Sequence, residues 1–148
     1  MKRMLSFRND ERGATLVEFA IGASIALTVM FGVLEFGRAL WVHNALTDAA
    51  RRGARYAVLH PSTDTAGVKN VVVYGDPAGG TTPLVTDLAT TNVSVNYSNF
   101  GLSNGTVTVS ITSYEFKFLL PLLTTKIQMP GYATTLTGES AGLIPANL

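Results

Sequence analysis

Cysteine is absent from the 148-residue chain, and histidine occurs only twice, as His43 and His60. Without thiols the chain has no disulfide framework, no thiolate metal site and no cysteine nucleophile. Neither histidine has a carboxylate at a spacing that metal ligands use, so the sequence predicts no metal site. Glycine-rich phosphate loops and the G-x-S-x-G nucleophile motif are also missing. We therefore expect no cofactor, no catalytic residue and no enzymatic activity.

Charge is scarce as well: 14% of the residues are charged, and the formal net charge is +1. No basic patch interleaved with aromatic residues is present, which argues against a nucleic-acid partner. Four basic residues gather within residues 1–13, which form a short leader that the positive-inside rule places in the cytoplasm. Four arginines between positions 38 and 55 weaken this rule, so charge alone leaves the orientation open.

A long apolar run follows the leader, from Ala14 to Leu34, with Glu18 as its one charged residue. At about 1.5 Å per residue, a helix of this length spans a bilayer core of roughly 30 Å. A cleaved secretory signal would have a shorter apolar core and a small-residue cleavage site after it. A buried core helix is also disfavoured, because a small domain could hardly cover a helix that is apolar all round. We therefore predict a transmembrane helix over residues 14–34.

The helical pattern continues beyond the run, over residues 35–59, and changes its character. Apolar residues recur there at a 3.6-residue spacing, and polar residues fill the other side, until Pro61 ends the helix. Glu35 and Arg38 stand three positions apart and are expected to form a solvated pair on the helix surface. An amphipathic helix must bury its apolar face, against its own C-terminal domain or against a neighbouring subunit.

Four glycines interrupt the predicted helix: Gly22, Gly32, Gly37 and Gly53. Small residues let membrane helices approach one another closely, and membrane helices also tolerate glycine without using it. The sequence leaves both explanations open.

We expect residues 60–140 to form a small β-rich domain and residues 141–148 to form a tail. A strand is expected at Val68–Tyr74, and residues 84–90 fit either a short helix or an irregular crossing. The clearest signal is a hairpin, because alternating apolar residues at 93–97 and 107–111 flank a loop with the turn pair Asn104-Gly105. The fold class is therefore α+β, with a long N-terminal helix before a small antiparallel sheet.

The apolar alternation changes phase after residue 111, since Tyr114, Phe116 and Phe118 occupy even positions. A one-residue slip turns a strand over, so a bulge or bend is expected near residues 112–113. A last strand pair is expected between residues 126–129 and 132–138.

The stretch Arg12 to Glu18, RGATLVE, resembles the processing site of type IV prepilins. Together with EFGRALWVHNALTDAARRGARYAV after the apolar run, it resembles the TadE-like minor pilins and pseudopilins of Tad (Flp) pilus systems. The likeness covers residues 8–60 closely and the β-rich part less distinctly. It implies cleavage by a prepilin peptidase between Gly13 and Ala14. The N-terminus would then be cytoplasmic, the helix would cross the inner membrane, and the C-terminal domain would lie outside.

The resemblance also implies partners: the peptidase, other pilin subunits, inner-membrane pilus assembly proteins and the lipid bilayer. Cleavage would expose an α-amino group one helical turn before Glu18. An amine and a carboxylate are each costly in low dielectric and tolerable together, so Glu18 can pair with the amine of a neighbouring subunit. The alternative is that Glu18 reaches the interface and pairs with nothing.

Two other interpretations remain beside a non-catalytic minor pilin or pseudopilin. An uncleaved single-pass membrane protein that presents the β domain as an adaptor or sensor predicts an intact leader and no dependence on Glu18. An enzyme predicts titratable residues clustered in a pocket, for which the β region offers few candidates.

Overall fold

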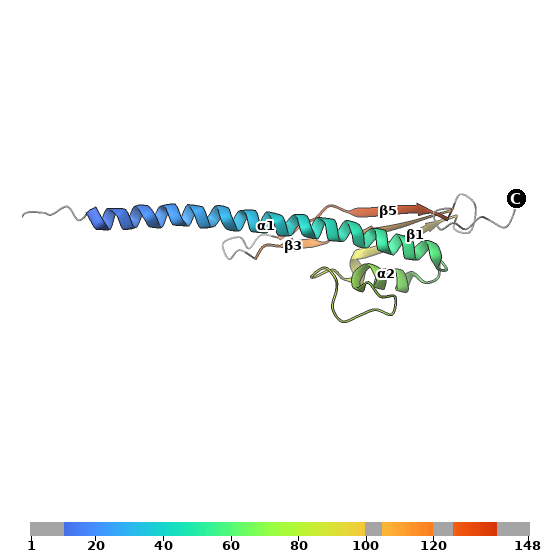
Figure 1. Cartoon of the computed structure of the whole chain (residues 1–148). Helices are drawn as coiled ribbons and strands as arrows, with labels where there is room; N and C mark the ends of the chain where they lie inside the picture. The colour runs from blue at the N-terminus through green and yellow to red at the C-terminus, as the bar shows by residue number, and fades with distance from the viewer. Residues whose placement is uncertain (1–10, 100–104, 120–125, 139–148) are drawn as a thin grey trace, which may run out of the picture. The chain divides into compact units, whose positions relative to one another are not determined.

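A computed structural model describes residues 11–99, 105–119 and 126–138. It confirms the α+β class, with one long helix followed by small antiparallel sheets (Figure 1). Most of the predicted leader, the Asn104 half of the turn pair and the predicted tail lie outside the described residues. The chain divides into two compact units, Met1–Gly37 and Arg38–Leu148, which we call unit 1 and unit 2.

Helix α1 runs from Glu11 to Leu59 and belongs to both units. It ends directly before His60-Pro61, as predicted, because the residue that precedes a proline is pushed out of the helical region. From Gly13 to Gly37 its side chains are exposed, apart from the half-buried Ala23 and the buried Glu35. Within unit 2 one stripe of α1 is buried, and it consists of small and branched residues: Val42, Leu46, Ala49, Ala50, Ala54, Ala57 and Val58.

The expected strand at residues 68–74 is wrong, because Thr65–Tyr74 form helix α2. The Asp64 side chain caps this helix by accepting a 3.0 Å hydrogen bond from the Gly67 amide. Gly75 ends it in the left-handed conformation, with φ of 81°. Burial of Val68, Val72 and their neighbours on one face outweighs the preference of valine for strands.

The predicted hairpin is confirmed by β1 (Val93–Ser98) and β2 (Thr106–Ile111), which pair antiparallel with Val95 opposite Val109. The short 3₁₀ helix Thr90–Asn92 leads into β1. Residues 84–89 are an irregular crossing, anchored by the buried Val85 and Leu88.

The predicted break after β2 is also found, and the strand pairing beyond it differs from the prediction. Ser113 adopts a positive φ of 57°, and β3 (Glu115–Lys117) then enters a separate sheet with β4 (Lys126–Gln128). Strand β5 (Tyr132–Thr137) pairs with β2 and completes a three-stranded sheet in the order β1-β2-β5. The expected pair between residues 126–129 and 132–138 is therefore wrong.

The core of unit 2 lies between the sheet and the two helices. Val107, Val109 and Ile111 of β2 are fully buried and belong to one cluster with the apolar stripe of α1 and with α2. At Gly53 the helix backbone comes so close to α2 that an added Cβ would overlap a methyl group of Val72. Gly53 therefore allows close packing within unit 2. Of the four glycines in the predicted helix, this one has a packing role and is not merely tolerated.

Candidate functional site

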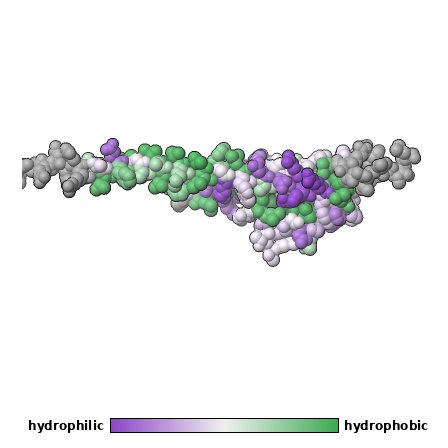
Figure 2. All heavy atoms as spheres, viewed as in Figure 1, coloured by the Kyte–Doolittle hydropathy of each residue, from purple (hydrophilic) through white to green (hydrophobic). Residues whose placement is uncertain are grey.

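The first half of α1 is a continuous apolar surface that nothing in unit 1 covers. Phe19 is 72% exposed, Leu16 69% and Val33 66%. In Figure 2 hydrophobic residues line this half of the helix, whereas hydrophilic residues gather over its second half. The helix from Gly13 to Leu59 is long and apolar enough to cross a membrane, and its most apolar window has no buried residue among those described. An apolar helix of this kind needs hydrocarbon or other helices around it.

Two hydroxyl groups in this segment bond to their own helix. Ser24 Oγ donates to the carbonyl oxygen of Ala20 at 2.7 Å, and Thr28 Oγ1 donates to that of Ser24 at 2.8 Å. A hydroxyl that is satisfied inside its own helix enters an apolar surrounding without leaving a donor unpaired. The segment thus presents one ionisable group between Ala14 and Leu34, the carboxylate of Glu18.

Glu18 is exposed and forms no hydrogen bond or ion pair with any residue that the structure describes. It stands four positions after Ala14, which in a helix is about 6 Å along the axis. Gly13 and Ala14 are exposed and lie within the first turns of α1, and an added Cβ at Gly13 would meet nothing within 4 Å. The predicted cleavage bond is therefore accessible to solvent, but its backbone is helical. A protease that needs an extended substrate has to unwind this turn.

Glu35 and Arg38 are not the solvated pair that was expected. Glu35 is only 8% exposed, and Arg38 is half-buried. An ion pair between them stays a prediction. The Arg38 guanidinium lies over the ring of Phe116, 4.1 Å from its centroid, and donates a hydrogen bond to the carbonyl oxygen of Lys117.

This role of Arg38 as an anchor for β3 was missed from the sequence. Phe116 is 2% exposed and meets Phe118 edge to face, with ring centroids 5.3 Å apart. A guanidinium over an aromatic face gains electrostatic energy on top of the buried area. The alternation of Phe116 and Phe118 indicated a change of strand face after residue 111, but nothing local links residue 116 to residue 38.

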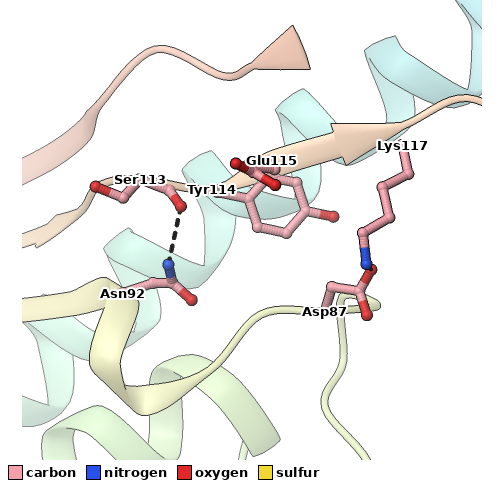
Figure 3. Close-up of a pocket in the computed structure, with 6 residues that line it drawn as sticks. All are labelled: Asp87, Asn92, Ser113, Tyr114, Glu115 and Lys117. Atoms are coloured by element: carbon pink, nitrogen blue, oxygen red, sulfur yellow. Dashed lines mark hydrogen bonds and ion pairs between the residues drawn. The ribbon is translucent and has the colours of Figure 1, made fainter. Parts of the chain in front are cut away.

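A shallow hollow of about 180 Å³ opens beside β3, lined by six residues (Figure 3): Asp87, Asn92, Ser113, Tyr114, Glu115 and Lys117. Lys117 Nζ lies 2.7 Å from an oxygen of Asp87, and this hydrogen bond raises the pKa of the lysine. Asn92 donates to the carbonyl oxygen of Ser113 at 3.1 Å, and the Tyr114 hydroxyl donates to that of Thr86 at 2.8 Å. Burial raises the pKa of Tyr114. These contacts tie the 84–92 crossing to β3, so the polar groups of the hollow serve the fold.

Neither histidine lies in that hollow. Nδ1 of His43 is 2.9 Å from the hydroxyl of Tyr132, and Nδ1 of His60 is 2.9 Å from the carbonyl oxygen of Tyr56. Within the described ranges 11–99, 105–119 and 126–138, no group of three His, Asp or Glu residues is placed to hold a metal ion.

Comparison with known proteins supports the resemblance drawn from the sequence. Residues 13–55 match the family model of TadE-like proteins, which confirms the likeness over the apolar run and the helix that follows it. No curated protein and no solved structure gives a significant match. The family indicates a protein associated with a Tad pilus, and together with the apolar helix it indicates a membrane protein.

Proposed function

We propose, on the premise of the TadE-like match over residues 13–55, that this chain is a non-catalytic minor pilin or pseudopilin of a Tad-type pilus or related secretion system. A prepilin peptidase would cut it between Gly13 and Ala14. The mature helix would stay in the inner membrane, with unit 2 outside, and would associate there with other pilin subunits and with inner-membrane assembly proteins. The substantial unit 2 argues for a minor component, since the major pilins of this class are nearly all helix.

The observation that carries the proposal is the single charged group, a carboxylate, on a largely apolar and exposed helix segment. Glu18 has no partner among the described residues, and hydrocarbon supplies none. Cleavage would create an α-amino group at Ala14 that is positively charged below about pH 8. In a bundle of subunits, this amine and Glu18 of a neighbouring chain neutralise each other, which fixes the axial register of the helices.

One observation favours the uncleaved alternative, a membrane-anchored adaptor or sensor. The bond between Gly13 and Ala14 lies in helical backbone, which is a poor protease substrate until it unwinds. Helix ends open readily, and a glycine in a helix costs about 1 kcal/mol relative to alanine, so unwinding at this position is cheap. The helical backbone at this bond is therefore compatible with processing.

The proposal is tested by substitutions at Glu18 in cells that assemble the pilus. Glu18→Gln keeps the shape of the side chain and removes its charge, and we expect it to be processed normally while few or no pili form. Glu18→Asp should restore part of the assembly, because the charge is kept. Ser24→Ala is the matched control, since it removes a polar group from the same segment whose hydroxyl bonds only its own helix. Normal piliation with Glu18→Gln would remove the pairing argument.

A further inference from the structure

We propose that unit 2 makes a second contact with the membrane: the end of this unit that holds Arg38 rests on the outer interface of the bilayer. The contact is made by four apolar side chains, which we call the Arg38-end surface: Leu40, Trp41, Leu119 and Ile127. The inference rests on the membrane span of the proposed function and adds to it a surface on the folded unit. Its occupant is lipid at the boundary between headgroups and acyl chains.

The first argument is where the exposed apolar side chains of unit 2 lie. Among the residues that the structure describes there, six large apolar side chains are strongly exposed: Leu40 (48%), Trp41 (59%), Leu59 (64%), Leu84 (50%), Leu119 (75%) and Ile127 (49%). Isolated exposed residues such as Leu59 and Leu84 are ordinary on a soluble surface. Four of the six lie at one end of the unit, and exposed apolar side chains gathered in this way mark interaction sites.

The contacts of Arg38 place these four at the same end of unit 2. Leu40 and Trp41 follow Arg38 within one helical turn. Arg38 bonds the carbonyl of Lys117, and Leu119 stands two residues further on, which is at most about 7 Å away. Ile127 stands opposite Phe116 in the β3–β4 ladder, and Phe116 is the ring that the guanidinium covers.

The second argument is the distance to the apolar run, which holds for any orientation of the two units. Arg38 follows Leu34, the last residue of the run, by four positions, and a fully extended chain of four residue steps spans about 14 Å. The polar layer of a bilayer adds roughly 5–8 Å beyond each face of the hydrocarbon core. The Arg38 end of unit 2 is therefore held at the headgroup layer or directly beside it.

The third argument is the chemistry of the surface. An indole ring with an apolar body and one N–H donor is favoured at membrane interfaces, and Trp41 is the only tryptophan of the chain. Lys117 and Lys126 face each other across the β3–β4 ladder, half-exposed, with ion pairs to Asp87 and Glu115. The ion-paired lysines are polar, and Leu119, two residues after Lys117, is exposed and apolar. Interfacial segments have a polar-to-apolar boundary of this kind.

The absence of cysteine makes this surface accessible to single-cysteine labelling. We would place an environment-sensitive fluorophore on Leu119→Cys and, separately, on Ile127→Cys in the full chain reconstituted in lipid nanodiscs. Nitroxide-labelled lipids then quench the fluorophore, with the nitroxide either near the headgroup or near the end of the acyl chain. Leu59→Cys is the matched control, because it replaces a leucine whose exposure of 64% lies between those of Leu119 and Ile127, about 30 Å along the helix axis from Arg38. Ala26→Cys, inside the apolar run, reports on the span itself.

We expect the Leu119 and Ile127 labels to be quenched at least about twofold more than the Leu59 label, and more by the shallow nitroxide than by the deep one. The Ala26 label should show the reverse order of depth. If the Ala26 label is quenched and the Leu119 and Ile127 labels behave like the Leu59 label, the surface does not face lipid and the inference is overturned, with the span intact. If the unlabelled Leu119→Cys chain forms disulfide-linked pairs and the labelled chain escapes quenching, a second copy occupies the surface and the inference is overturned. An unquenched Ala26 label would contradict the membrane span together with the inference.

Discussion

The two halves of helix α1 use similar residues in opposite ways. Both are rich in alanine and branched apolar residues, and both contain glycine. In unit 1 an added Cβ at Gly22 would meet nothing within 4 Å, whereas at Gly53 in unit 2 it would overlap Val72 and come within 3.2 Å of Val109. The first half leaves its apolar surface uncovered by the rest of unit 1, whereas the second half has one stripe packed within unit 2. Gly53 therefore has a packing role within its own chain, whereas the close approach of other helices at Gly22 stays a prediction.

The comparison predicts its largest change in stability for the replacement of phenylalanine by alanine in the two units. Phe116→Ala removes a buried ring beneath Arg38 and should lower the free energy of unfolding of unit 2 by about 3–5 kcal/mol. Phe19→Ala, at a position 72% exposed, should change it by less than about 0.5 kcal/mol. Chemical denaturation of the full chain in detergent, followed by near-ultraviolet circular dichroism, measures both. Equal effects at the two positions would contradict the division of the helix.

The next effect is at glycine. Gly53→Ala should destabilise unit 2 by about 1–3 kcal/mol, because the fully buried Val72 cannot move away without disturbing its neighbours. Gly22→Ala should leave the stability of unit 2 unchanged. The same denaturation assay measures both variants. The double variant Gly53→Ala/Val72→Ala should lose less free energy of unfolding than the two single variants lose together, because the new methyl group fills the space that Val72 leaves.

A smaller effect should appear only at alkaline pH. Burial raises the pKa of Tyr97, Tyr114 and Tyr132 above the ordinary value for tyrosine of about 10. The folded state then keeps these phenols neutral, so their contribution to stability is complete below pH 10 and is lost as pH rises through the folded pKa values. Denaturation midpoints measured between pH 8 and pH 11 should fall at the alkaline end, and Tyr114→Phe should make that fall shallower. A stability that stays level across this range would contradict the burial of these hydroxyl groups.

The smallest effect belongs to the exposed face of α1. Arg52 and Asp48 form a 2.7 Å ion pair one turn apart, with side chains 36% and 64% exposed. Asp48→Ala should cost less than about 0.5 kcal/mol, and added salt should reduce the difference. A cost above 1 kcal/mol would show that the pair acts through contacts other than its own charges.

The helix and the β1–β2 hairpin were predictable because their signals are local. A largely apolar run of 21 residues, a proline at position 61 and alternation around a turn each determine structure within a few residues. Helix α2 had local signals as well, since Asp64 and Gly75 mark its two ends. The valine run between them outweighed those caps in the prediction, because valine favours strands when its tertiary surroundings are unknown.

Strand partners and the anchor at Arg38 could not be read from the sequence. Residues 126–128 and 132–137 both have strand character, but whether they pair with each other or with β3 and β2 depends on contacts between distant segments. The cation–aromatic contact of Arg38 and Phe116 joins positions 78 residues apart. At the candidate site, Gly13, Ala14 and Glu18 were identified through the family resemblance, and their roles stay predictions.

The measurement that tests the central claim most directly is the intact mass and N-terminal sequence of the membrane-extracted protein, from cells with and without the prepilin peptidase. The account predicts a chain that begins at Ala14 when the peptidase is present and at Met1 when it is absent. A chain that begins at Met1 in both strains would contradict processing, and it would leave the uncleaved membrane adaptor as the better description.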